Sequence, residues 1–312
     1  MGALRSGYRL DIQRKASLRK DKSMRPLEII ADLKSDRIKD VIIDGDFGAD
    51  GDDQFALGYA LAAPDKVRVI AVTAAPYNDN SCETVESGRQ EAQDIVDVAG
   101  YNVKYGVHAG SPDYITRKGE AVNGDGVEVI AKAVRESDGM VYIVSTGCIT
   151  NVTSALLLYP DIADKLCCVW LGLDGLDSVS NTGEYNYHND IEGGKLLFEH
   201  AKNLVLVEAG RTVAPYRRTD GEICEQYNES PLARHLAERF CAISWAQGLW
   251  DLCGESVFII PEACEFRVAP RPVFDEKGEI LYLDESRTMV AVNKNDHARI
   301  AADSRERING HK

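Results

Sequence analysis

The sequence predicts an α/β fold with one open, mostly parallel sheet and helices on both of its faces. From Ile38 onward, short β-branched runs alternate with helical patterns, which is typical of α/β domains. The expected strands are almost continuously apolar, as strands are when helices bury both faces of a sheet. In such sheets ligands bind beyond the carboxyl ends of the strands, so functional residues are expected in the loops that follow strands.

The first strand-helix-strand unit is the clearest part of the pattern. Residues 41–43 are expected as a strand, and apolar residues from Phe55 to Ala63 recur at helical spacing until Pro64 ends the helix. Val67–Ala74 is expected as the next strand. Further strands are expected over Val141–Ser145, 168–173 and 204–207, with helices near 151–159, 192–200 and 232–246.

The composition is that of an ordinary folded chain. Its 312 residues are 44% hydrophobic and 28% charged, close to the averages of globular proteins. The net charge of −14 argues against a general attraction to nucleic acid or to anionic membranes. Apolar runs are too short to span a bilayer, so we expect an intracellular protein with a small ligand. The eight cysteines form no CxxC pair and are expected as reduced thiols, Cys224 and Cys264 being the most exposed.

The N-terminal segment differs from the rest in charge. Residues 1–25 carry eight basic residues against two acidic ones. We therefore divide the chain into a basic, flexible leader over 1–37 and one domain over 38–312. The alternatives for the leader are a transit-like segment or, from Gly2 and Ser6, an acylation site.

An acidic loop follows the first strand directly. Five aspartates occupy ten positions, at 44, 46, 50, 52 and 53. Carboxylates this close repel one another unless a cation or solvent offsets their charge. A hard divalent ion explains the pattern, and a glycine-containing loop suits Ca²⁺ better than the stricter octahedron of Mg²⁺. The alternative is a solvated turn in which Asp52 starts the following helix.

Other loops after strands carry polar side chains. Asn78 follows the second strand, and Thr146 follows a later one. On an extended segment, Glu184, Asn186 and His188 would share one face. Interleaved amides and carboxylates of this kind suit the hydroxyls of a sugar.

Taken together, these segments resemble the inosine-uridine preferring nucleoside hydrolase family over roughly residues 38–305. The family opens with Asp-x-Asp and, after a short loop, an Asp-Asp pair at a helix start. It also has a Thr-Gly-x-x-Thr-Asn segment, a Glu-Phe-Asn segment and a His-Asp pair. The corresponding residues here are Asp44 and Asp46 with Asp52 and Asp53, then Thr146 to Asn151, Glu184 to Asn186, and Trp250 with Asp251.

The resemblance implies calcium-dependent hydrolysis of the N-glycosidic bond of a ribonucleoside on the nucleoside hydrolase fold. It implies calcium ligands at Asp46, Asp53, Asp251 and the carbonyl of Thr146. It implies sugar contacts from Asp52, Asn78, Glu184 and Asn186, with Asp46 accepting a proton from the attacking water. It also implies a homodimer or homotetramer, a cytoplasmic location and a role in purine or pyrimidine salvage.

One position departs from the family pattern. Trp250 stands where other members have the histidine that protonates the leaving base, and an indole donates no proton to it at neutral pH. His188 is the candidate replacement, with a hydrogen-bonded structural histidine as the alternative. Trp250 is expected to stack on the base or line the pocket, with ordinary core packing as the alternative. Two other functions stay open: binding of a nucleoside without cleavage, and a haloacid-dehalogenase-type phosphatase that uses Asp44, Asp46 and Mg²⁺.

Overall fold

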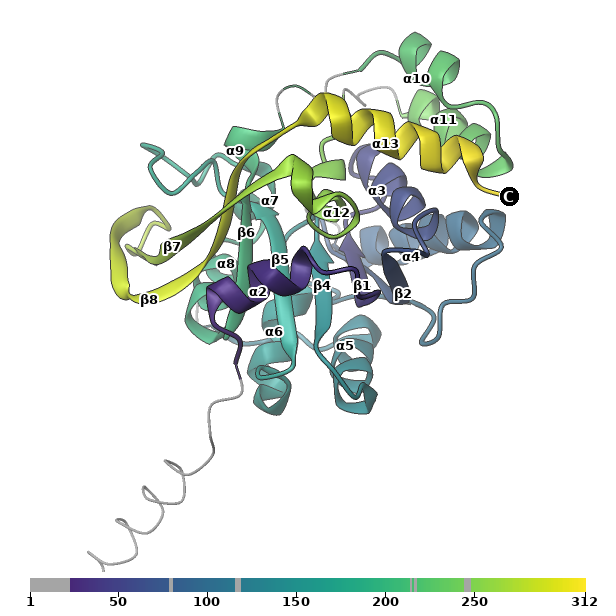
Figure 1. Ribbon diagram of the computed structural model, residues 1–312. Coiled ribbons are helices and arrows are strands. Elements are labelled where there is room, and N and C mark those ends of the chain that lie inside the picture. The colour runs from purple at the N-terminus through teal and green to yellow at the C-terminus, as the bar shows by residue number, and fades with distance from the viewer. Residues whose placement is uncertain (1–22, 79–80, 116–118, 214, 216–217, 244–247) are drawn as a thin grey trace, which may run out of the picture.

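A computed structural model describes residues 23–78, 81–115, 119–213, 215, 218–243 and 248–312. Its centre is an eight-stranded sheet in the order β3-β2-β1-β4-β5-β6-β8-β7 (Figure 1). Neighbouring strands run parallel, except that β7 and β8 pair antiparallel at one edge. The predicted fold class, an open and mostly parallel sheet with helices on both faces, is confirmed.

The strands that build the sheet include every strand expected from the sequence. They are β1 (Lys39–Gly45), β2 (Val67–Ala74), β3 (Val107–Ala109), β4 (Val141–Ser145), β5 (Leu166–Gly172), β6 (Asn203–Glu208), β7 (Cys264–Phe274) and β8 (Ile280–Asn295). The helices before β6 are α2 (Pro26–Leu33), α3 (Asp52–Leu61), α4 (Ser81–Val98), α5 (Asp125–Glu136), α6 (Thr150–Leu158), η1 (Pro160–Ile162), α7 (Tyr185–Asn189) and α8 (Ile191–His200). Those after β6 are α9 (Ala209–Thr212), α10 (Asp220–Gln226), α11 (Pro231–Ala242), α12 (Leu252–Ile259), η3 (Pro261–Ala263) and α13 (His297–Gly310).

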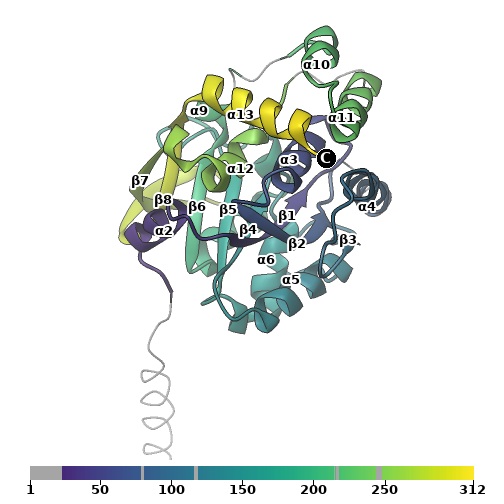
Figure 2. The same cartoon turned by 45° about the vertical axis from the view of Figure 1, so that its right-hand side comes forward.

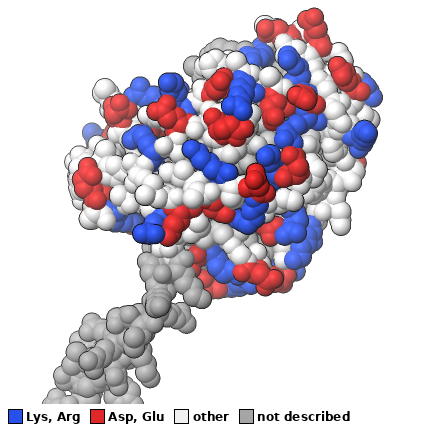
Figure 3. Space-filling view, in the orientation of Figure 1, with Lys and Arg blue, Asp and Glu red and all other residues white. Residues whose placement is uncertain are grey.

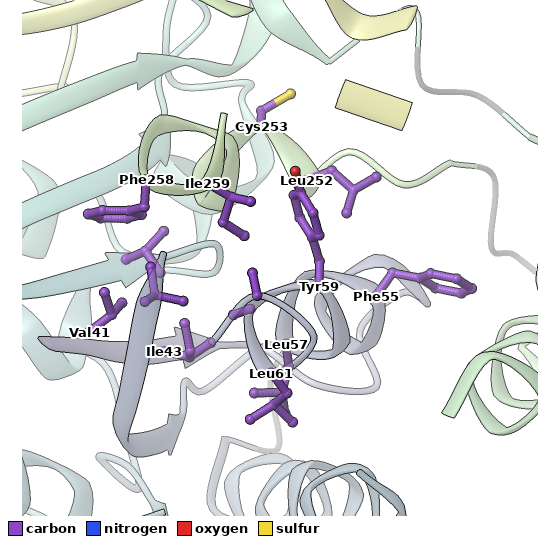
Figure 4. Packing of buried hydrophobic residues seen from close by; sticks show 14 of the residues in the cluster. Val41, Ile43, Phe55, Leu57, Tyr59, Leu61, Leu252, Cys253, Phe258 and Ile259 are labelled. Carbon is purple, nitrogen blue, oxygen red and sulfur yellow. The ribbon is translucent and has the colours of Figure 1, made fainter. Parts of the chain in front are cut away.

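Alternation along β1 shows how both faces of the sheet are buried. Val41 and Ile43 point to one side, where they pack with residues of α3 and α12 (Figure 4). Ile42 points to the other side and joins a separate core formed with α5, α6 and α8. Figures 1 and 2 show α5 and α6 on one side of the sheet and α3, α12 and α13 on the other. The continuous apolar run of β1 is explained by this double cover.

The start of the fold lies earlier than the sequence indicated. Helix α2 packs on β6, β7 and β8, and its Ile29 and Leu33 are fully buried. The backbone N–H of Met24 donates to Asn203 Oδ1 at 2.7 Å. Residues 23–37 were predicted as part of the leader, but their short helix α2, which contains no basic residue, packs on the sheet and belongs to the fold. Residues 1–22 lie outside the described part.

The other differences from the predicted elements have simple physical causes. The β7–β8 hairpin was not expected, because β8 begins with solvent-exposed residues such as Tyr282 and carries several charges. Helix α11 ends at Ala242, earlier than the predicted 246, and residues 244–247 lie outside the described part. Cys264 was expected near the surface and is buried where β7 starts.

The surface agrees with the mixed composition. On the face drawn in Figure 3, basic and acidic side chains are interspersed over the described residues. Within the described part of the chain, helices long and apolar enough to cross a lipid bilayer are absent.

Candidate active site

The carboxyl ends of the central strands bring distant segments of the chain together. Asp46 follows β1 by one residue and Thr146 follows β4 by one residue, and the two strands pair with Asp44 opposite Ser145. Glycine allows the close approach: a Cβ added at Gly147 would lie 3.0 Å from Cβ of Asp46. Asp251 reaches the same place as the N-cap residue of α12.

Three carboxylates form a buried cluster there. Asp52 and Asp53 at the start of α3 and Asp251 before α12 each offer an oxygen, and these oxygens all lie within 4.8 Å of one another. All three side chains are at least nine-tenths buried. Burial raises the pKa of each carboxyl, and for Asp52 and Asp251 the charge of the neighbouring carboxylates raises it further.

Asp46 lies beside this cluster with one oxygen unused. Its Oδ2 is buried and has no hydrogen-bond partner among the described residues. Asp53 Oδ1 is held in place, since it accepts from the Asp46 backbone N–H at 3.1 Å and from Thr146 Oγ1 at 2.8 Å. A buried, unpartnered carboxylate oxygen beside three carboxylates fits an oxygen-liganded divalent cation, which would offset their repulsion.

Asp44 is as buried as Asp46, but its carboxylate is hydrogen-bonded and has a structural role. Its carboxylate accepts from Thr73 Oγ1 at 2.6 Å, Ser145 Oγ at 2.9 Å and Asn151 Nδ2 at 2.8 Å. These donors come from β2, β4 and α6, so Asp44 fastens three elements to β1. A fully buried carboxylate anchored by three donors is poorly placed to attack a phosphate, which disfavours the phosphatase alternative.

The segment that carries Glu184 is a short helix and not the expected extended segment. Glu184 is the N-cap of α7, and its carboxylate accepts from the backbone N–H groups of Asn186 and Tyr187. It also accepts from the N–H of Leu173 at 3.0 Å. Despite these bonds, burial raises the pKa of Glu184 to about 7. The polar alternation in the sequence therefore reflects helix capping.

Asn186 uses its amide to join two strand ends. Its Nδ2 donates to the carbonyl of Thr146 at 2.6 Å and to the carbonyl of Leu171 at 3.0 Å. The predicted metal-ligand carbonyl of Thr146 thus already accepts one hydrogen bond, which leaves one lone pair. Asn186 Oδ1 remains the free end of the side chain in the pocket.

Asn78 adopts a left-handed backbone conformation, with φ of 56°. Asparagine adopts this conformation more readily than most other residues apart from glycine. Its side-chain Oδ1 lies 3.5 Å from the hydroxyl of Tyr185, and its carbonyl accepts from Tyr114 at 3.0 Å.

These groups line one cavity of about 630 Å³. Nine of the ten side chains predicted for the site line it, namely Asp46, Asp52, Asp53, Asn78, Thr146, Glu184, Asn186, Trp250 and Asp251. The wall is completed by Asp50, which belongs to the acidic loop, and by seven residues that were not predicted, namely Ala49, Leu171, Asp174, Tyr185, Ala209, Gly210 and Val213. Asp174 follows β5 by two residues, so the strand-end rule could have found it; the apolar residues carry no such signal.

His188 is the tenth predicted residue, and it does not line the cavity. Its side chain is exposed, and Nδ1 lies 2.9 Å from the carbonyl of Thr182. Because α7 is helical, positions 186 and 188 point in different directions. The geometry therefore gives no support to His188 as the proton donor.

The fold and the site can now be set beside known proteins. The family model described as inosine-uridine preferring nucleoside hydrolase matches residues 41–299. The chain belongs to this family. The resemblance noted in the sequence is thereby confirmed, and the chain is an enzyme of the N-glycosyl hydrolase class.

Individual relatives of this nucleoside hydrolase differ in their named preferences. The pyrimidine-specific ribonucleoside hydrolase RihA of Salmonella schwarzengrund (strain CVM19633) is 29% identical over 224 residues, which cover 64% of this chain and 69% of the relative. A solved inosine-guanosine nucleoside hydrolase superposes with a TM-score of 0.69 at 21% identity, over 88% of this chain and 100% of the other. A purine-preferring ribonucleoside hydrolase from Gardnerella vaginalis also gives 0.69, at 19% identity, over 87% of this chain and 98% of the other.

Proposed function

We propose that this nucleoside hydrolase holds one calcium ion and cleaves the N-glycosidic bond of a ribonucleoside to release base and ribose. The observation that carries the proposal is the buried oxygen cluster at 52, 53 and 251 beside the unpartnered Oδ2 of Asp46. Asp46, Asp53, Asp251 and the Thr146 carbonyl would hold the ion. When bound, calcium orients a water molecule and lowers its pKa.

The residues around the ion have separate tasks in this proposal. Asp46 accepts the proton of the attacking water through its unpartnered oxygen. Asp52, Asn78, Glu184 and Asn186 accept or donate to the ribose hydroxyls, which fixes the sugar over the carboxylates. The negative charge stabilises the oxocarbenium-like sugar of the transition state.

The base faces the less polar wall of the cavity. Trp250 and Tyr185 supply aromatic surface, and Leu171 and Val213 supply aliphatic surface. Because Trp250 donates no proton to a departing base, we expect the enzyme to prefer bases that leave without protonation by this residue. A homodimer or homotetramer, a cytoplasmic location and a role in nucleoside salvage stay predictions that follow from the family.

The test is a reducing-sugar assay over a panel of purine and pyrimidine nucleosides. Chelator-treated protein should release no sugar, and Ca²⁺ should restore release better than Mg²⁺. A nucleoside-dependent rise in Tm without sugar release would favour the alternative that the chain only binds nucleosides. Phosphate release from phosphomonoesters with Mg²⁺ would contradict the proposal and support the phosphatase instead.

A further inference from the structure

Two cysteines far from the cavity lie in direct contact with each other. Sγ of Cys224 on α10 and Sγ of Cys241 on α11 are 2.8 Å apart. Both are present as thiols, and a disulfide requires a sulfur-sulfur distance of about 2.05 Å. The two side chains therefore need less than about 1 Å of movement to form a covalent bond.

The surroundings of the pair allow a reagent to reach it. Cys224 is solvent-exposed and Cys241 is half-buried, whereas the other thiols described, at 148, 167, 168, 253 and 264, are buried. For Cys148 and Cys167, burial raises the pKa well above its usual value, which suppresses the reactive thiolate. Among the described cysteines, exposure and proximity thus coincide at one pair.

We propose that Cys224 and Cys241 form a reversible disulfide that ties α10 to α11. The oxidant is a small-molecule disulfide of the glutathione class. The thiolate of Cys224 attacks it, forms a mixed disulfide and releases one small thiolate. The thiolate of Cys241 then attacks the sulfur of Cys224 and releases the second. Both protein thiols lose their protons to the two released thiolates, and two electrons pass from the protein to the reagent.

The disulfide would stiffen the helix pair α10 and α11, which packs against α3 of the active site. Phe240, next to Cys241, packs edge-on against Phe55 of α3 with ring centroids 6.1 Å apart, and Tyr227 after α10 packs on the same ring at 4.8 Å. Helix α3 begins with Asp52 and Asp53. Segments on either side of the helix pair carry the cavity residues Val213 and Trp250. Oxidation therefore constrains helices that contact α3, whose first two residues line the pocket, whatever nucleoside the pocket binds.

The experiment is non-reducing peptide mapping of the full-length protein by mass spectrometry, after equilibration with glutathione redox buffers of increasing oxidised fraction. We expect a peptide pair that joins Cys224 to Cys241 with the loss of two hydrogens, and its disappearance after reduction. Thiol titration of the native protein should fall by two per chain.

Cys224→Ser and Cys241→Ser are matched controls, since each keeps one sulfur and the shape of the site. Either variant should lack the internal link and show at most a glutathione adduct on the remaining cysteine. Wild-type protein that gives only such an adduct, or only a link between two chains, would overturn the proposal. Because the readout is a mass, the result does not depend on hydrolytic activity.

Discussion

The two ends of the cavity are built in different ways. The acidic end consists of nine-tenths-buried carboxylates that follow β1, begin α3 and precede α12, and its Asp53 is fixed by hydrogen bonds from Asp46 and Thr146. The apolar end consists of Leu171 on β5 and of residues from short connections, namely Tyr185 on α7, Val213 after α9, and Trp250, which is half-buried. The end proposed to carry the chemistry is thus anchored directly to the sheet. The end proposed to face the base takes most of its residues from short helices and loops.

The largest expected effect concerns the acidic end. Asp53→Ala removes one oxygen of the three-carboxylate cluster and the acceptor for the Asp46 N–H. We expect kcat/KM for nucleoside hydrolysis to fall by about 10³-fold, because both ion binding and the position of Asp46 are lost.

The control for Asp53→Ala is Asp138→Ala, which removes an exposed carboxylate between α5 and β4. Its activity should equal that of the wild type. If a folded Asp53→Ala protein kept more than about a tenth of the wild-type rate, the reaction would not depend on the acidic end.

The next effect concerns the apolar end. Trp250→His places an imidazole in the wall of the cavity, where the family pattern has one. We expect kcat for purine nucleosides to rise by about 10²-fold, since general acid catalysis contributes roughly that much. The gain should vanish as the pH rises above about 6.5 and the imidazole loses its proton.

Trp250→Phe is the control for that variant, because it keeps an aromatic ring and adds no proton donor. Equal losses of activity in both variants would mean that the indole itself is needed at the apolar end, and that departure of the base is not limited by proton supply.

Calcium should stabilise the acidic end even without substrate. At a concentration 100 times its dissociation constant, an ion that binds only the folded state adds about 2.7 kcal/mol to the free energy of unfolding. Urea unfolding with Ca²⁺ and with chelator measures this difference, and Asp251→Asn should abolish most of it. Equal stabilisation of Asp251→Asn and wild type would show that the ion binds elsewhere.

The last prediction concerns the pH dependence of stability and tests whether Glu255 lies outside the acidic end. Glu255 on α12 is buried but does not line the cavity, and its side-chain oxygens have no hydrogen-bond partner among the described residues. Burial raises its pKa from 4.5 to about 8. The folded state therefore holds a proton that the unfolded state releases, so stability falls as the pH rises from 4.5 through 8.

Glu255→Gln removes this dependence. In chelator, the stability advantage of the variant over the wild type should grow as the pH rises from 5 to 9, as urea unfolding measures. Glu238→Gln, at an exposed site on α11, is the matched control and should follow the wild type. If the free energy of unfolding of Glu255→Gln and of the wild type changed in parallel with pH, Glu255 would not be protonated in the folded state.

The sequence predicted the two ends of the cavity unequally, for a physical reason. Carboxylates packed after a strand are costly without a ligand, so the acidic loop was recognisable in the sequence. Leu171 and Val213 look like any core residue, and only the fold shows that they face a cavity. The strands Val67–Ala74 and Val141–Ser145 were predicted correctly, because both segments are rich in β-branched and apolar residues.

Local hydrogen bonds explain the main errors. The segment after Glu184 looked extended, but the carboxylate of Glu184 satisfies two backbone N–H groups and starts a helix. The sequence analysis gave Asp44 no separate role in the hydrolase, and only the donors at Thr73, Ser145 and Asn151 show that Asp44 is structural. The partners of Asp44 come from distant parts of the chain, which no local pattern reveals.

The contact between Asp53 and Asp251 also has a consequence for biosynthesis. One follows the first strand, and the other is translated only after six strands of the sheet have emerged from the ribosome. Until α12 docks, the early aspartates stay hydrated and bear their charge at little energetic penalty. The complete set of carboxylates proposed to bind the ion is therefore assembled only when most of the polypeptide has been made.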